Sequence, residues 1–420
     1  MDIYLYIINV VLYVGFFVYL YRKKNLGTRY ALPLVGLFAV SSICAVLYHN
    51  TTLYWALTES GGKHPSLWAL LFIFINFVIY ISPLSKLNNS DYNLPYYKHI
   101  VYFTVFLGIV AILPTIEFAS MLNQSSVTDM AEQYELNQSE TVDFGKKLSF
   151  LGRSCNGILS WFSYITPVLL FYVIAVNAKK KVIFLAAVAF IEPIMGPLMR
   201  GGRGHLFMFV MLLLFNYLLF YKYFRESTKK IVSKIGLFSI GLVALLLVSM
   251  TIARTATSDA TSDINIVLSA IYRYIGEGFV NFAETGWYTE KFTDGLSIFN
   301  GTGYTWMSEL GDFFQQRDWQ RLTQYMGFRM YVYYTVFGDY YLDFGLVGGM
   351  LFNVVLGFVF YRIVSKKNSK LYILITINLY ARIGMNGIYC YYYMNYMEFL
   401  LFSFLVIYLL SIYEKRFIKC

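Results

Sequence analysis

The chain contains repeated uninterrupted apolar stretches of about twenty residues, and this pattern constrains its fold more than any other feature. A helix of about 20 apolar residues is long enough to cross the hydrocarbon core of a bilayer. Of the 420 residues, 58% are hydrophobic and 14% are charged, whereas ordinary soluble domains carry about 25% charged residues. A soluble domain could not bury so much apolar surface, and four cysteines are too few for a disulfide-rich secreted scaffold. The sequence predicts an all-α polytopic membrane protein.

We expect eleven transmembrane helices that form a single integral membrane domain over residues 1–420. The expected spans are 3–21, 30–48, 67–84, 100–116, 157–177, 182–199, 205–221, 235–252, 342–361, 371–389 and 393–412. The first span does not have the features of a removable signal peptide. No basic stretch precedes its apolar core, and no small-residue cleavage site follows it.

The distribution of lysine and arginine predicts the orientation of the chain. If the N-terminus lies outside, the short cytoplasmic segments hold 21 of the 34 lysines and arginines but only three of the 24 acidic residues. Cytoplasmic loops of membrane proteins carry this kind of positive excess. The net charge of +10 therefore reflects membrane orientation, so nucleic-acid binding has no support. The C-terminus is expected in the cytoplasm.

Two of the predicted outer loops are long, about 117–156 and about 253–341. Connections of such length are usually functional or disordered. The second loop is rich in Tyr, Trp, Phe and Gly, so we expect it to be folded, with partial helices over Ile264–Phe282 and Tyr325–Leu342. The working face of the protein is therefore expected outside.

Several common motifs of enzymes are absent from the sequence. It has no GxxxxGK[ST] phosphate loop, no GxGxxG after a strand, no DxD, no HExxH and no CxxC. The cytoplasmic segments are also too short to form a nucleotide-binding domain. An enzyme of this kind must therefore take its substrates from the membrane or the outer face.

The strongest local signal is the turn from Arg200 to His205, which joins the sixth and seventh predicted spans. Arg200, Arg203 and His205 stand among three glycines. Glycine lets a backbone approach a ligand closely, a helix N-terminus favours anions, and arginine binds phosphate through two parallel hydrogen bonds. The turn therefore indicates a phosphate or pyrophosphate site. The alternative is a tight loop whose arginines reach lipid headgroups.

A second group of candidates lies in the long late loop. Aromatic side chains alternate there with arginines and acids, an arrangement that suits sugar rings and phosphates. Its members are Arg254, Arg273, Tyr274, Glu277, Arg317, Arg321 and Arg329. The alternative is an amphipathic helix that rests on the membrane interface with its tyrosines at headgroup level.

A third group leads from this loop into the ninth predicted span. Asp339 and Asp343 are four residues apart, so they share one face of a helix. Either carboxylate is a candidate base, and the alternative is an ion pair with an arginine. Glycines on either side favour close helix packing.

Three charged residues fall inside predicted spans, namely Glu192, Arg382 and Glu398. Charges inside a membrane are costly and mark functional positions by default. The alternative is a buried ion pair of Arg382 with Glu398 or with Glu192. Glu117, at the end of the fourth span, is expected at the interface.

These motifs together resemble the O-antigen and capsule repeat-unit polymerases of the Wzy type. The matching features are the turn Arg200–His205, the segment Tyr274–Phe282 in one large late outer loop, and the segment Gly338–Gly348. The number of spans and the layout of the loops agree over nearly the whole chain.

The resemblance implies a metal-independent glycosyltransferase with a GT-C-like membrane fold and no cofactor. Such enzymes join oligosaccharide units carried on undecaprenyl pyrophosphate, which serve as both donor and acceptor, at the outer face of the bacterial inner membrane. A chain-length regulator and a flippase are implied partners. Arginines would neutralise the pyrophosphate and a base would accept the proton of the acceptor hydroxyl.

The expected roles follow from this mechanism. The candidates for the base are His205, Glu277 and Asp339, and the candidates for substrate or pyrophosphate binding are Arg200, Arg203, Arg254, Arg273, Arg329 and Tyr274. Two other functions stay open. An O-antigen ligase differs only in its acceptor, and a flippase or solute transporter would use the charges inside the spans to line a path. Transporters often show two related halves, which this sequence lacks.

Overall fold

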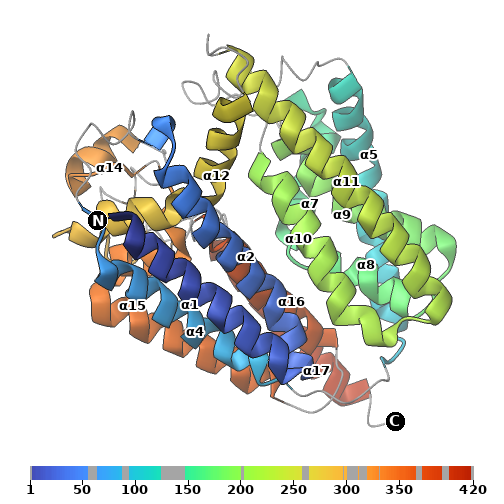
Figure 1. Ribbon diagram of the computed structural model, residues 1–420. Helices are drawn as coiled ribbons and strands as arrows, with labels where there is room; N and C mark the ends of the chain where they lie inside the picture. Colours follow the sequence, from blue (N-terminus) through green and yellow to red (C-terminus); the bar gives the residue numbers. More distant parts are fainter. Residues whose placement is uncertain are drawn as a thin grey trace. The chain divides into compact units, whose positions relative to one another are not determined.

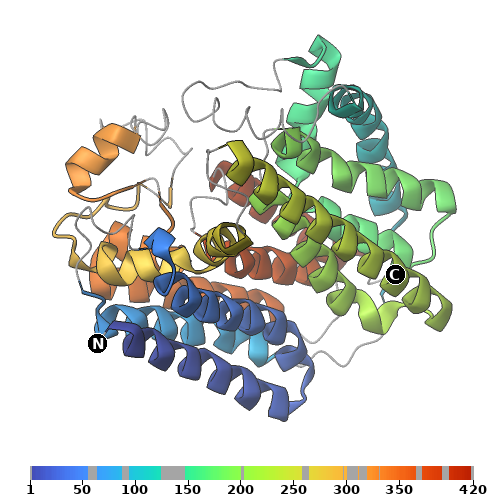
Figure 2. The same cartoon turned by 45° about the horizontal axis from the view of Figure 1, so that its top comes forward.

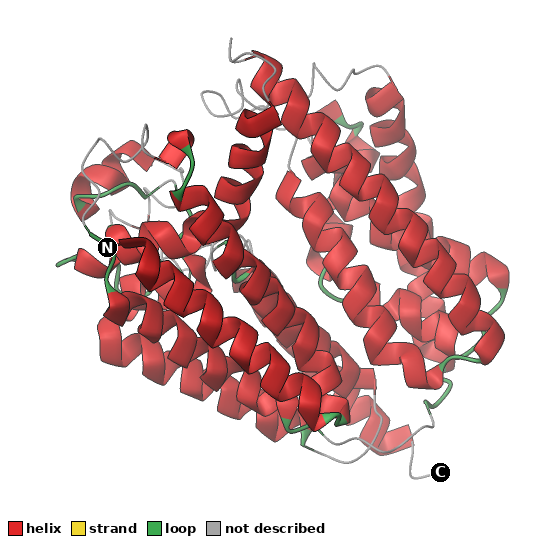
Figure 3. Cartoon of the chain, in the orientation of Figure 1, coloured by secondary structure: helices red, strands yellow, loops and turns green. Residues whose placement is uncertain are grey.

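The computed structural model describes residues 2–54, 64–87, 94–123, 147–199, 203–257, 264–296, 298–299, 311, 319–330, 332–365, 371–389 and 397–417. Every regular element in these ranges is a helix, as the sequence predicts (Figure 3). The helices are α1 (Asp2–Lys23), α2 (Leu26–His49), α4 (Leu67–Ser85), α5 (Lys98–Asn123), α7 (Phe150–Phe162), α8 (Thr166–Ala175), α9 (Lys180–Met199), α10 (Arg203–Phe220), η2 (Tyr221–Tyr223), α11 (Glu226–Thr257), α12 (Ile264–Glu284), η3 (Gly286–Tyr288), α14 (Trp319–Met326), α15 (Thr335–Val364), α16 (Leu371–Asn386) and α17 (Met397–Phe417).

The chain divides into two compact units. Unit 1 comprises Met1–Ser90, Leu268–Asn368 and Leu379–Leu401, and it contains α1, α2, α4, most of α12, and α15. Unit 2 comprises Asp91–Val267, Ser369–Asn378 and Phe402–Cys420, and it contains α5 and α7 to α11. The expectation of one integral domain over the whole chain stays a prediction.

Seven helices of the described part are long and apolar enough to cross a membrane, and all seven lie at predicted spans. They are α1, α2, α4, α5, α9, α10 with η2, and α15. The predicted span 157–177 is broken into α7 and α8, which meet at 76°. Pro167 lies at the start of α8 and has no N–H to donate to the carbonyl of Ser163, so a straight helix cannot continue. The total of eleven spans and their orientation stay predictions.

An aromatic core holds the helices of unit 1 together. α1 lies beside α2, and α4 lies beside α15 (Figures 1 and 2). Phe38 of α2 is fully buried, and its ring centroid lies 4.3 Å from that of Phe77, 6.2 Å from Phe279 and 5.9 Å from Phe337. These rings belong to α4, α12 and α15. One side chain of α2 therefore contacts three other helices of the unit.

The backbone of α12 comes unusually close to that of α2. A Cβ atom on Gly276 would lie 2.4 Å from the Ala45 nitrogen and 2.5 Å from the Cys44 carbonyl carbon, so only glycine fits there. Beside this contact, the Ser41 hydroxyl donates a 2.6 Å hydrogen bond to the carbonyl of Ile275. The glycine next to Glu277 thus serves helix packing, which fixes how α12 is placed against α2.

The long late loop is partly helical, and one of its two predicted partial helices is interrupted. The helix predicted over Ile264–Phe282 is confirmed as α12. The segment Tyr325–Leu342 is helical at both ends but is not one helix, because α14 ends at Met326 and α15 begins only at Thr335. Gly327 has a φ of 77°, a left-handed conformation that ends a helix.

The first long loop is shorter than its predicted bounds of 117–156. α5 continues to Asn123 and α7 begins at Phe150. Glu117 is therefore inside α5, where it accepts hydrogen bonds from the Ser149 nitrogen at 3.0 Å and the Ser149 hydroxyl at 2.6 Å. The Ser149 hydroxyl also accepts a 3.0 Å bond from the Gly152 nitrogen. Glu117 thus holds the N-terminal cap of α7 on α5.

We predict that Gly276→Ala destabilises the protein, because the new methyl group would overlap the backbone of α2. Overpacking of this kind costs about 1–3 kcal/mol. The thermal unfolding temperature of the purified protein in detergent measures the effect. Gly15→Ala is the matched control, since a Cβ on Gly15 meets nothing within 4 Å. An equal response of the two variants would contradict the close approach of α12 and α2.

Candidate functional site

The candidate site is built on one face of α12. Arg273 and Glu277 are one helical turn apart, and Glu284 lies two turns further along the same face. The Arg273 Nε–H donates a 2.9 Å hydrogen bond to Glu277 Oε2. The Glu277 side chain is 10% exposed and the Arg273 side chain 39% exposed. A charge-assisted bond of this kind holds the Glu277 carboxylate in a defined orientation.

The electrostatic surroundings of two tyrosine hydroxyls indicate which other charged residues lie near the Arg273–Glu277 pair. The Tyr48 hydroxyl, near the end of α2, lies within electrostatic range of Arg273, Glu277, Glu284 and Arg329. The Tyr334 hydroxyl, just before α15, lies within range of Glu277, Arg329 and Asp339. The structure thus brings four predicted site residues into one region of unit 1, namely Arg273, Glu277, Arg329 and Asp339.

Arg329 is exposed, and three hydrogen bonds hold the backbone of the turn that carries it. The buried Tyr334 hydroxyl donates to the Arg329 carbonyl. The Met330 nitrogen donates to the Thr323 hydroxyl at 3.1 Å, and Asn281 of α12 donates to the Tyr333 carbonyl at 3.1 Å. These bonds attach the turn to α12 and α14. The arginine therefore extends from a fixed backbone toward the outside of the unit.

The two aspartates of α15 have different surroundings. Asp343 is fully buried and accepts hydrogen bonds from the Thr293 hydroxyl and, at 2.8 Å, from the Ile298 nitrogen. It therefore holds the segment after η3 against α15. Asp339 is 6% exposed and lies on the side of Tyr334 and Arg329. Of the two, Asp339 is the one placed with the candidate site.

Tyr274 belongs to a group of three tyrosine rings beside the Arg273–Glu277 pair. Its ring centroid lies 6.1 Å from that of Tyr333 and 5.1 Å from that of Tyr389. The rings of Tyr333 and Tyr389 are also 5.1 Å apart. The Thr335 nitrogen donates to the Tyr389 carbonyl at 2.8 Å, which ties this group to the start of α15. Aromatic faces next to charged groups suit the binding of sugar rings.

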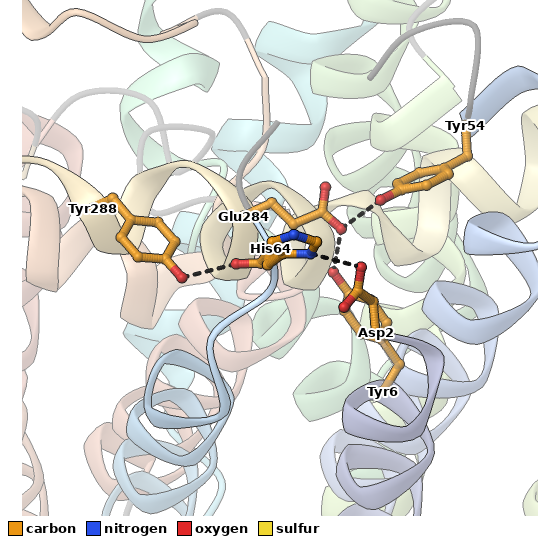
Figure 4. A network of polar contacts seen from close by, with 6 residues as sticks. All are labelled: Asp2, Tyr6, Tyr54, His64, Glu284 and Tyr288. Carbon is orange, nitrogen blue, oxygen red and sulfur yellow. Dashed lines mark hydrogen bonds and ion pairs between the residues drawn. The ribbon is translucent and has the colours of Figure 1, made fainter. Parts of the chain in front are cut away.

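A second polar cluster lies at the end of α12, and the sequence analysis did not include it. Glu284 is 3% exposed, and its Oε1 accepts hydrogen bonds from the hydroxyls of Tyr6 and Tyr54, at 2.7 and 2.8 Å (Figure 4). These tyrosines come from α1 and from the turn after α2. No sequence motif marks Glu284, because its two partners are 278 and 230 residues away in the chain.

Further contacts surround the Glu284 cluster. His64 Nδ1 lies 3.1 Å from Asp2 Oδ2, and the Tyr288 hydroxyl donates a 2.8 Å bond to the His64 carbonyl (Figure 4). The Ser66 nitrogen donates a 3.0 Å bond to the Ala283 carbonyl. The first turn of α1, the segment before α4 and the end of α12 therefore meet at one place.

Burial raises the pKa of Glu284 from 4.5 to about 7. The largest cause is the loss of hydration on burial, which disfavours the carboxylate. The hydrogen bonds from Tyr6 and Tyr54 oppose this shift, and the negative charge of Asp2 adds to it. The protein thus carries, beside its candidate site, a carboxyl group that changes its charge near neutral pH.

The remaining predicted residues fall in three groups. Arg200 lies outside the described residues. Arg203 and His205 begin α10 and Arg254 lies in α11, but their side chains and that of Glu398 in α17 are outside the described part. Arg382 lies in α16. Glu192 of α9 is fully buried, and neither of its carboxyl oxygens has a hydrogen-bond partner among the described residues.

The described residues contain no group of three or more His, Cys, Asp or Glu side chains that could hold a metal ion. The expectation of a metal-free and cofactor-free protein stays a prediction. Comparisons with protein-family models, with curated proteins and with solved structures found no match to this chain. The comparisons therefore assign no family to it, and the resemblance to the repeat-unit polymerases rests on the short motifs of the sequence.

We predict that the protein loses stability as pH rises from about 5 to about 8. Glu284 has a pKa of about 7 in the folded protein and about 4.3 in an unfolded chain. The folded state therefore binds more protons in this range, so the free energy of unfolding falls with increasing pH, by up to about 3 kcal/mol. Thermal unfolding across this range measures the slope.

The matched variants for this prediction are Glu284→Gln and Glu290→Gln. The amide oxygen that Glu284→Gln introduces can still accept from both tyrosines but carries no titrating proton, so the slope should flatten. Glu290 is exposed in the same region, and its variant should keep the wild-type slope. An unchanged slope in Glu284→Gln would contradict the assignment.

Proposed function

We propose that the chain is a membrane glycosyltransferase that joins lipid-linked oligosaccharide repeat units. The observation that carries the proposal is the grouping of Arg273, Arg329, Glu277 and Asp339 around Tyr48 and Tyr334 in unit 1. Cations and carboxylates together are what transfer from a pyrophosphate carrier requires. The apolar helices that surround such a site suit a substrate held in the membrane by its lipid.

In the proposed reaction, the bond between the anomeric carbon of the donor glycan and its pyrophosphate oxygen breaks. A new bond forms between that carbon and a hydroxyl oxygen of the acceptor. The acceptor proton passes to a carboxylate, and the lipid pyrophosphate leaves with the bonding electron pair. The protein therefore has to stabilise negative charge on the leaving group and to place a base beside the acceptor.

The described residues take distinct roles in this reaction. Arg329, exposed on an anchored turn, binds the donor pyrophosphate. Arg273 orients Glu277 through their 2.9 Å bond and adds positive charge. Glu277 and Asp339 are the two candidates for the base in the described part, and Tyr274 contacts sugar rings. His205, Arg200, Arg203 and Arg254 keep their sequence-based assignments as base or pyrophosphate ligands.

The same proposal places the protein in the inner membrane of a bacterium, with the site at the outer face. Undecaprenyl-pyrophosphate-linked oligosaccharides are the donor and the acceptor. A chain-length regulator and a flippase are the proposed partners. The glycan product is O-antigen or a related surface polysaccharide, because the resemblance covers both kinds of polymerase.

We predict that Arg329→Ala and Glu277→Gln each lower polymerisation about 100-fold or more, as expected for the loss of a charge stabiliser or a base. Gel electrophoresis of surface glycan from cells without the gene, complemented with each variant, measures this effect. The wild-type copy should restore a ladder of chain lengths. The two variants should leave a single repeat unit, although the protein is present in the membrane.

Arg362→Ala is the matched control, because Arg362 is an exposed arginine in the last turn of α15, away from the site. It should restore the full ladder. Loss of all surface glycan, with long chains accumulating on the lipid carrier, would instead indicate a ligase. A ladder that does not depend on the gene would contradict both functions.

A further inference from the structure

Helices α5 and α9 of unit 2 lie side by side along most of their length. A Cβ atom on Gly108 of α5 would lie 2.4 Å from Leu185 Cβ and 2.7 Å from the Leu185 carbonyl oxygen. The two backbones are therefore almost in contact at this level. Gly108 and Leu185 define which residues of the two helices face each other.

The same register continues toward the C-terminal ends of both helices. Phe118 and Met199 belong to one buried cluster, against which Leu122 and Met195 are packed. A Cβ atom on Gly196 of α9 would lie 3.4 Å from Cζ of Phe118 on α5. This contact nearly keeps the offset between the two helices that Gly108 and Leu185 define, so the helices run parallel. Residues two helical turns beyond Gly108 and Leu185 again face each other, because an α-helix has about 3.6 residues per turn. Those residues are Thr115 and Glu192.

Glu192 is fully buried, whereas Thr115 is half-buried and only its hydroxyl oxygen is shielded from solvent. Glu192 is 0% exposed, and neither of its carboxyl oxygens, nor the buried Thr115 hydroxyl oxygen, has a hydrogen-bond partner in the described part of the chain. An unpaired carboxylate in an apolar interior is strongly unfavourable. Inside a membrane such a group marks a functional position by default. The charge of Glu192 therefore has to be neutralised, by a proton or by another small cation.

Two prolines interrupt the helical hydrogen bonding next to this level. Pro114 precedes Thr115, and Pro193 follows Glu192. Because proline has no N–H, the carbonyl groups of Val110 and Ala189, one turn earlier, lose their intrahelical donors. The level of Glu192 therefore offers a carboxylate and a hydroxyl, and one turn earlier two carbonyls lack their usual helical donors. Such a set of oxygens binds cations and repels anions.

The charged groups on the helices around α9 lie elsewhere. The charged and titratable groups of the packed helices are Lys98, His99 and Glu117 on α5, Arg153 on α7, none on α8, and Arg203 and His205 on α10, whose side chains are not described. The nearest along α5 is Glu117, whose carboxylate is engaged with Ser149 on the side of α7.

We propose that Glu192 and Thr115 form a buried site for a single small monovalent cation, a proton or a sodium ion, between α5 and α9. The site is separate from the glycan site in unit 1 and does not depend on the function proposed for it. Binding neutralises Glu192 inside the apolar interior of unit 2. Release leaves a buried carboxylate, which is unfavourable, so occupancy is coupled to the packing of the two helices.

Labelling with dicyclohexylcarbodiimide tests this proposal, because this apolar reagent enters membranes and reacts with protonated carboxyl groups. The acid O–H adds across the carbodiimide C=N bond, and the product rearranges to a stable N-acylurea. The purified protein in detergent is labelled between pH 5 and pH 9, and the adduct on Glu192 is measured by mass spectrometry of peptides. No glycan substrate is needed, so this result is independent of the polymerase test.

The proposal expects labelling of Glu192 that falls about tenfold per pH unit above a midpoint. If sodium chloride, compared with choline chloride, lowers the labelling, the ligand is sodium, and if the two salts act alike the ligand is a proton. Glu117 is the internal control on the same helix pair and should stay unlabelled at neutral pH. Absence of labelling on Glu192 at every pH, or labelling that depends on neither pH nor sodium, would overturn the proposal.

Thr115→Val provides the second measurement, since valine keeps the shape of threonine without its hydroxyl. In the proposed site the Thr115 hydroxyl stabilises the ionised form of Glu192, and the variant removes this hydroxyl. The labelling midpoint should therefore move to higher pH, and any protection by sodium should weaken. A midpoint and a sodium response equal to those of the wild type would remove Thr115 from the site.

Discussion

The structure depends on how its few acidic side chains are satisfied in an interior that is almost entirely apolar. A buried carboxyl group must receive hydrogen bonds or carry a proton. The buried Asp343 and Glu284 and the half-buried Glu117 each accept two bonds, and in each case the donors come from a segment that is distant in the chain or irregular in conformation. These acids therefore act as fixed points where loops and helix ends attach to the apolar helices. Glu192 differs, since no described group bonds to it.

The hydrogen bonds to Glu284 also affect the candidate site, because they help to fix α12 against the other helices of unit 1. Gly276 lets the two backbones touch, Ser41 bonds to Ile275, and Glu284 is held at the end of the helix. These three attachments leave α12 little freedom to rotate about its own axis. The Arg273–Glu277 pair therefore has a defined direction relative to Arg329 and Asp339, although all four residues lie in a region that the sequence describes as a loop.

The sequence predicts the helices better than the site. Apolar stretches alone locate α1, α2, α4 and α15, because a bilayer requires a fixed length of apolar helix. The break at Gly327 inside Tyr325–Leu342 was not predicted, since a single glycine is compatible with a helix or with its end. Arg273, Glu277, Arg329 and Asp339 could be selected by residue type and local pattern. Glu284 could not, because its environment is made by two tyrosines far away in sequence, and no local pattern encodes such contacts.

The hydrogen bond between Tyr6 and Glu284 also sets an order of assembly. The two residues are separated by 278 positions, so the ribosome completes nearly all of unit 2 before the partner of Tyr6 exists. Unit 1 consists of three separate segments of the chain. Its first helix, α1, is therefore synthesised long before Glu284, the hydrogen-bond partner of Tyr6. Pairing over such distances is slow because closing a long loop costs entropy. Truncated chains that end before α12 would thus contain a nearly finished unit 2 beside an open unit 1, and the membrane insertion machinery would have to retain α1 until synthesis passes residue 284.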